Sequence, residues 1–111
     1  MKIAVSSTGK NLADSVSDVF GRSPYFVIAE IEGKEIKGTE IIENKSTGQM
    51  TGVGISAAQL IAEKNVNAVI TGNVGPRAFE VLKQFNIEIY YGSGKIEEVL
   101  QKFIDGKLEK I

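Results

Sequence analysis

The second half of the chain alternates between short apolar runs and stretches with helical spacing, and this alternation limits the fold more than any other feature. The runs "NAVIT" (67–71) and "IEIYY" (87–91) are typical of buried strands. The stretches around them repeat apolar residues three and four positions apart, which places those side chains on one face of a helix. A strand, a helix and a second strand favour a right-handed crossover, which makes the two strands parallel. The sequence therefore predicts α/β units in this half.

Three helices are expected here, each with its own apolar face. The first ends at Asn65, and the second starts at Pro76, because proline suits the first helical position. The third has Glu97 and Glu98 in its first turn and Gly106 just past its end. The three apolar faces consist of Val53, Ala57, Leu60 and Ile61; of Ala78, Phe79, Leu82 and Phe85; and of Ile96, Val99, Leu100, Phe103 and Ile104.

The first half reads as strands joined by polar connections. A strand is expected from Lys2 to about Ser6, followed by an irregular connection that Pro24 closes. Two further strands form a hairpin through Gly33 and Lys34, and the Gly-rich stretch after them (45–54) is a loop. The order is βββαβαβα. It predicts an α/β fold in which helices flank a mixed β-sheet, within a single domain that covers residues 1–111.

Composition excludes several classes of protein. The 13 basic and 14 acidic residues leave a net charge of -1, so we expect no nucleic-acid partner. No apolar run is long enough to cross a bilayer and no signal pattern opens the chain, so we expect no membrane association. The 0 Cys of the sequence fit a cytoplasmic location.

Three polar segments follow the strands that we expect to be parallel. Ligands in such sheets bind beyond the carboxyl ends of the strands, and helix N-termini at that edge favour anions. We therefore predict a site for a small anionic ligand there. Its candidate residues are Ser6, Ser7, Thr8 and Gly9; Thr71, Gly72, Asn73 and Gly75; and Gly92, Ser93 and Gly94. The loop from Thr47 to Gly54 is placed to close over the same edge.

Each of these residues also has a purely structural interpretation. The glycines 72 and 75 suit a strand-to-helix turn, and Ser93 suits a helix cap. Asp14 and Asp18 suit capping or solvation. The run "GSGK" (92–95) departs from a phosphate-binding loop, because Ile96 stands where serine or threonine is needed.

The sequence contains few of the residue types that enzymes use for catalysis. The sequence has 0 His and 0 Cys, which removes the commonest general base and the thiolate nucleophile. No tight carboxylate cluster is present for a two-metal hydrolase. An enzyme that acts on a phosphorylated or nucleotide substrate is therefore the least supported class, and we expect no catalytic residue.

Several stretches together resemble the dinitrogenase iron–molybdenum cofactor biosynthesis family. They are "DVFGRSPYF" (18–26), "GVGISAAQLIAEKNVNAVITGNVGPRAFEVL" (52–82) and "GKIEEVLQKFIDGKL" (94–108). The resemblance implies a ribonuclease-H-like α/β fold. It also implies a small binder or carrier of an iron–sulfur or iron–molybdenum cluster precursor.

This chain differs from nitrogenase-linked members of the family in the side chains that could bind a metal. Nitrogenase-linked relatives often carry His before Phe-Gly-Arg, where this chain has Val19, and the soft atom in the Gly-rich loop is the Met50 thioether. Iron–sulfur clusters prefer thiolate or imidazole ligands, so a cluster here would be held by backbone N–H groups, hydroxyls and Arg22. The alternative for Arg22 is an ion pair. The alternative function is a protein-binding adaptor or regulatory module that uses the loop 45–54 and no metal cluster.

Overall fold

The computed structural model describes residues 1–111 and contains one six-stranded sheet. The strands lie in the order β3-β2-β1-β4-β5-β6. β1 is antiparallel to β2 and parallel to β4, which is in turn parallel to β5. The elements are β1 (Lys2–Ser7), β2 (Tyr25–Glu32), β3 (Glu35–Glu43), α1 (Val53–Ala62), β4 (Ala68–Thr71), α2 (Pro76–Gln84), β5 (Glu88–Tyr91), α3 (Ile96–Ile104) and β6 (Glu109–Lys110).

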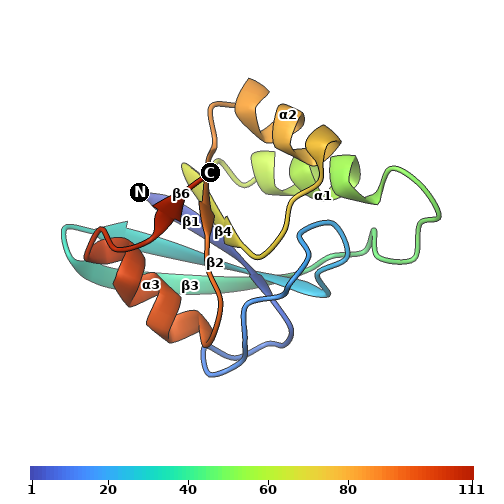
Figure 1. Ribbon diagram of the computed structural model, residues 1–111. Coiled ribbons are helices and arrows are strands. Elements are labelled where there is room, and N and C mark those ends of the chain that lie inside the picture. Colours follow the sequence, from blue (N-terminus) through green and yellow to red (C-terminus); the bar gives the residue numbers. More distant parts are fainter.

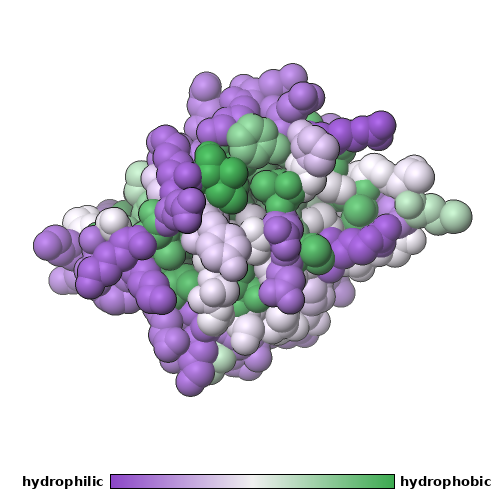
Figure 2. Space-filling view, in the orientation of Figure 1, coloured by the Kyte–Doolittle hydropathy of each residue, from purple (hydrophilic) through white to green (hydrophobic).

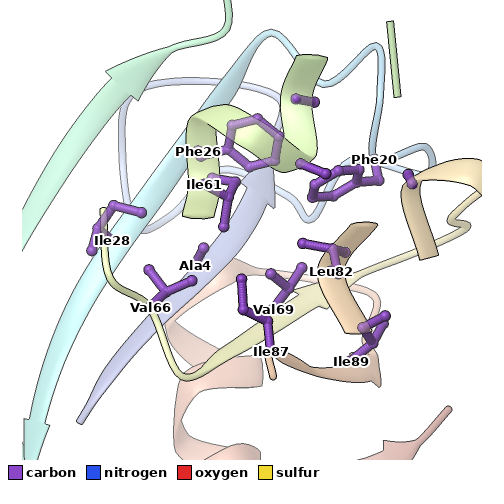
Figure 3. Packing of buried hydrophobic residues seen from close by; sticks show 13 residues of the cluster. Ala4, Phe20, Phe26, Ile28, Ile61, Val66, Val69, Leu82, Ile87 and Ile89 are labelled. Carbon is purple, nitrogen blue, oxygen red and sulfur yellow. The ribbon is translucent and has the colours of Figure 1, made fainter. Parts of the chain in front are cut away.

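The helices cover both faces of the sheet, because the central strands alternate buried apolar side chains to both sides. α1 and α2 lie together on one face and α3 lies on the other (Figure 1). The first face packs Ala4, Val69 and Ile89 of the sheet against Ile61 of α1 and Leu82 of α2 (Figure 3). The second face packs Ile3, Val5 and Ile70, among others, against Val99 and Leu100 of α3.

Figure 2 shows hydrophilic side chains along the margin of the molecule and hydrophobic residues gathered near the middle of this face. None of the helices has the length and apolar character that a membrane span requires.

A left-handed residue follows each helix within three positions and accommodates the turn. Asn65, Asn86 and Gly106 have φ values of 58°, 60° and 71°. After α3, the amides of Gly106 and Lys107 donate to the carbonyls of Phe103 and Lys102 at 3.0 and 2.8 Å, which is the Schellman pattern. The ends that we expected from Asn65 and Gly106 are therefore confirmed as turns, although α1 itself stops at Ala62.

The predicted fold class is confirmed: a mixed sheet flanked by helices, with elements in the expected order. The ribonuclease-H-like assignment and the single-domain boundary stay predictions. Two details differ from expectation. The chain adds β6, a two-residue strand paired with the edge of β5. Phe85, expected in the apolar face of α2, is 56% exposed because it follows the last turn and is directed to solvent.

Candidate functional site

A cleft of about 550 Å³ opens where α1 and α2 begin. Its walls come from the segment before β2, the end of the Gly-rich loop, and the first turns of the two helices. The lining residues are Val19, Phe20, Gly21, Arg22, Met50, Thr51, Gly52, Val53, Gly54, Ile55, Asn73, Gly75, Pro76, Arg77 and Ala78. Arg22, Asn73 and Gly75 were among the residues predicted for the site, and the structure brings these three together.

Both helices present uncapped N-termini to the cleft. The residues at the two N-cap positions are Gly52 and Gly75, and neither helix has a side-chain cap or an acidic residue in its first turn. In α1 the amides of Val53, Gly54 and Ile55 donate no hydrogen bond within the protein. Unsatisfied amides and the positive end of the helix dipole attract anions.

The N-terminus of α2 adds a second set of donors. Its first residue, Pro76, has no N–H, and the amides of Arg77 and Ala78 donate no hydrogen bond within the protein. Two helix termini therefore direct free donors into one cleft, a geometry suited to an anion with acceptors on more than one side.

Two arginines and no acidic residue line the cleft. Nη1 of Arg22 donates to the carbonyls of Thr47 and Gln49 at 2.9 and 3.3 Å. Neither arginine belongs to an ion pair, so the alternative that Arg22 pairs with a carboxylate is wrong. The charged side chains of the cleft are thus positive and not neutralised by neighbours.

Small residues allow the walls of the cleft to approach each other. A Cβ on Gly54 would lie 3.3 Å from Cβ of Ala78, at the contact between α1 and α2. A Cβ on Gly21 would lie 3.0 Å from Cα of Gly54. The first turns of both helices and the segment around Arg22 therefore meet closely only because Gly21 and Gly54 have no side chain.

The predicted hydroxyl residues Ser6, Ser7 and Thr71 lie beneath the surface, each 0% exposed. Oγ of Ser6 donates to Oγ1 of Thr71 at 2.8 Å, and Oγ of Ser7 donates to the carbonyl of Gly9 at 2.7 Å. The structure therefore uses these hydroxyls in internal hydrogen bonds and does not bring them to the cleft.

A chain segment covers them. Residues 8–19 cross the carboxyl ends of the strands, with bridges from Ser7 to Val16 and from Val19 to Asn73. Asp14 in this segment accepts a hydrogen bond from the amide of Asn11 at 2.9 Å and donates its own amide to the carbonyl of Asn11 at 3.0 Å, so it closes a local turn and caps no helix. The edge of the sheet that we predicted to be open is thus largely occupied by the chain itself.

The predicted glycines have different surroundings. A Cβ on Gly72 would lie 2.5 Å from the carbonyl oxygen of Asp18, and one on Gly92 would lie 2.5 Å from Cγ2 of Ile70. Gly75, in contrast, has no atom within 4 Å of that position. Gly72 and Gly92 therefore serve close packing, whereas Gly75 leaves space open at the cleft.

The segment 92–94 lies outside the cleft. Gly92 and Ser93 border a separate hollow near Lys102 and Lys107. The N-terminus of α3 is satisfied within the protein, because the amides of Ile96 and Glu97 donate to the carbonyls of Asp14 and Leu12 at 2.8 and 3.0 Å. Lys95 is the N-cap residue and no side chain caps α3, so the alternative role of Ser93 as a cap is wrong.

Sequence reasoning missed Arg77 as a residue of the cleft. The available signal was the pair Pro76–Arg77, which places a cation in the first turn of a helix, where the dipole disfavours it. A positive side chain in an unfavourable position next to free amides indicates a site for a negative partner.

The donor set of the cleft contains no ligand that iron prefers. No group of His, Cys, Asp or Glu side chains is arranged to hold a metal ion. The Met50 thioether is 93% exposed on the loop that borders the cleft. The cleft offers hydrogen-bond donors and positive charge instead.

Shifted pKa values occur outside the cleft, where β6 joins β5. The hydrogen bond from Lys110 at 2.8 Å, with a second from Tyr90, holds the pKa of Glu88 below its usual range. Burial, with the hydrogen bond to Glu88, raises the pKa of Tyr90. These groups fasten an edge strand and do not face the cleft.

Fold and cleft together define a small α/β protein with a positively charged cleft at two helix N-termini. The chain belongs to the dinitrogenase iron-molybdenum cofactor family, whose model matches residues 1–106, so the resemblance in the sequence is confirmed.

Relatives of this chain match it over nearly its full length. An uncharacterized protein of Methanocaldococcus jannaschii, MJ0580, is 46% identical over 99% of this chain and 91% of its own length. The apo form of the orange protein from Desulfovibrio gigas superposes with a TM-score of 0.92 at 30% identity, covering 99% of this chain and 92% of that one. The Thermotoga protein TM1290 superposes with a TM-score of 0.84 at 34% identity, covering 98% and 91%.

Proposed function

We propose that this protein is a non-enzymatic binding or carrier protein for an anionic iron–sulfur or iron–molybdenum cluster precursor, which the cleft at α1 and α2 holds. The observation that carries the proposal is the convergence of two uncapped helix N-termini and two unpaired arginines in a cleft without any carboxylate. The family description names the same cofactor, and the apo form of the orange protein presupposes a form with a bound group.

The hydrogen-bond donors of the cleft suit such a cluster, because they can bind its outer sulfide and oxo atoms without ligating the metal. Sulfide and oxo atoms of a cluster carry negative charge and accept hydrogen bonds from N–H groups. The amides of α1 and α2, Arg22, Arg77 and the side chain of Asn73 supply donors of this kind. Direct ligation of iron by protein side chains has no support, because thiolate and imidazole are absent from the sequence. A cargo held without covalent ligation is also one that a carrier can release.

The experiment is anaerobic expression, followed by elemental analysis and visible absorption of the purified protein. We expect iron or molybdenum and a sulfide charge-transfer absorption in the wild type. Arg77→Ala should bind the cluster precursor roughly ten- to hundredfold more weakly, which is the effect expected from the loss of one charge-assisted hydrogen bond. Lys83→Ala is the matched control, because it removes one positive charge from α2 outside the cleft. A wild type that retains no metal species, together with equal behaviour of the two variants, overturns the proposal.

A protein-binding adaptor is the second candidate, and the exposure of Met50 favours it. This side chain is 93% exposed at the border of the cleft, where Val19 is also 45% exposed. Exposed apolar side chains beside a binding cleft are typical of contact surfaces. A protein partner that co-purifies with the metal-free chain and is lost on Met50→Ser would support this function over cluster carriage.

A further inference from the structure

Arg22 holds the segment 45–52 to the body of the protein. Nη1 donates to two carbonyls of this segment, those of Thr47 and Gln49. Figure 1 shows the segment between β3 and α1 projecting from the rest of the molecule, and most of its residues are exposed. The guanidinium is therefore a main anchor of this loop.

Two side chains complete the attachment of the segment. Buried Asn44 donates to the carbonyls of Gly21 and Ser23 at 3.0 and 2.9 Å and accepts from the amide of Ser46 at 3.1 Å. At the other end, Oγ of Ser56 donates to Oε1 of Gln49 at 3.0 Å. The loop is thus tied at its start to the residues beside Arg22 and at its end to the first turn of α1.

The hydrogen bonds of Arg22 leave one edge of its guanidinium unused. Nε and Nη2 donate no hydrogen bond within the protein, and Arg22 lines the cleft. This edge carries two parallel N–H groups, the fork that binds carboxylates and other anions through two acceptors. One planar group can therefore serve the loop with Nη1 and an anion with its other edge.

We propose that Arg22 is a bridging residue that couples loading of the cleft to closure of the segment 45–52. This inference rests on the proposed function, because the anion at the free edge is the cargo. An anion bound there fixes the guanidinium, and the fixed guanidinium holds the carbonyls of Thr47 and Gln49 in place. The closed segment brings Met50 and Thr51 to the border of the cleft and positions the first amides of α1. Loading therefore orders the loop, and the ordered loop retains the cargo.

The test is hydrogen exchange of the amides 46–52 with and without a defined probe, the tetrathiomolybdate dianion, whose sulfides accept hydrogen bonds. In the wild type we expect loading to slow this exchange roughly 5- to 10-fold, the lower range of ordinary coupling between two sites. Arg22→Lys keeps the charge but has no planar fork. It should exchange faster than the wild type when unloaded, bind the probe more weakly because the fork is lost, and show no slowing at matched saturation. Arg77→Lys should bind more weakly and still show the slowing at matched saturation.

The outcomes separate this inference from the function on which it rests. If the wild type binds the probe and the segment does not slow, or if Arg22→Lys slows as much as the wild type, the coupling is refuted while anion binding stands. If the wild type binds neither the probe nor a cluster, the proposed function fails and the coupling fails with it. The unloaded comparison of wild type with Arg22→Lys still reports whether the guanidinium anchors the loop.

Discussion

Replacing Gly72 with alanine places a methyl group against the backbone of Asp18, and we expect this change to destabilise the protein by about 2–4 kcal/mol. The new Cβ would lie 2.5 Å from the carbonyl oxygen and 2.8 Å from the carbonyl carbon of Asp18. These are backbone atoms that cannot rotate away, so the segment 17–19 must move by roughly an ångström to reach ordinary contact.

Hydrogen bonds resist that movement. The amide of Asn73 donates to the carbonyl of Asp18 at 2.6 Å, and the amide of Phe20 donates to the carbonyl of Asn73 at 2.8 Å. Overpacking costs about 1–3 kcal/mol and one weakened hydrogen bond costs about 1 kcal/mol, which together give the expected range. At about 4 °C per kcal/mol, the melting temperature should fall by roughly 8–16 °C.

Gly75→Ala is the matched control on the same connection. Gly75 has φ -71° and ψ 163°, which any residue adopts, and no atom lies within 4 Å of the position of its Cβ. The unfolding free energy of the Gly75→Ala protein should stay within about 0.5 kcal/mol of that of the wild type. Because the methyl group enters the cleft, Gly75→Ala should instead weaken cluster binding.

Thermal and urea unfolding, followed by circular dichroism, give the melting temperature and the unfolding free energy of both variants. The slope of the unfolding free energy against urea concentration should equal that of the wild type, which shows that the denatured state is unchanged. A Gly72→Ala protein that melts within 2 °C of the wild type, or a Gly75→Ala protein that falls as far as Gly72→Ala, would refute the reasoning. In that case the close approach of the segment 17–19 would not be the reason for glycine at position 72.

Three further predictions concern other parts of the molecule. Thr71→Val should cost about 1 kcal/mol in urea unfolding, because it removes one of the two hydrogen-bond partners of Ser6 Oγ and leaves only the carbonyl of Ser17, and it should leave cluster binding unchanged; weaker binding by a folded variant would place Thr71 at the ligand. Asn44→Ala should cost about 2–3 kcal/mol, because two carbonyls lose their donor, and a midpoint equal to the wild type contradicts this. Glu88 has a lowered pKa, so its bond with Lys110 is present at neutral pH and is lost only as the pH falls below the ordinary titration range of a glutamate; the protection of the amides near β6, relative to their intrinsic exchange rate, should then fall, and Glu88→Gln should abolish that pH dependence.

Local patterns were enough to predict most of the elements. The apolar spacing of Ile96, Val99 and Leu100 is a property of neighbouring residues, and all three are buried as expected. Proline at the start of α2 and glycine after α3 act through their own backbone angles, so their positions could be predicted without a tertiary structure. β6 was missed because two residues carry no periodicity, and only the pairing with Tyr90 and Tyr91 makes them a strand.

The site was harder to predict, because its composition depends on the path of an irregular segment. Nothing in the spacing of residues 8–19 indicates that they cross the ends of β1, β4 and the start of α3. Arg77 was not predicted, because the opposite walls of the cleft, residues 19–22 and 50–55, are more than 20 residues away in the chain. Asn73 was predicted because it follows an expected parallel strand in a polar, Gly-rich segment, and Arg22 because its guanidinium can donate to an anionic cluster.

The path of this segment also explains which polar groups remain available to a ligand. In an open parallel sheet the carboxyl ends of the strands and the helix N-termini beside them are free together. Here the segment 8–19 covers the strand ends and supplies carbonyls to the N-terminus of α3. Buried polar groups must be paired, and the hydroxyls of Ser6 and Thr71 are consumed in that pairing. A cluster of free donors is left beyond the edge of the segment, where α1 and α2 begin. Recognition of an anion must therefore come from main-chain amides and the two arginines. Removing a hydroxyl at a strand end should lower the stability of the protein and leave its affinity for the anion largely unchanged.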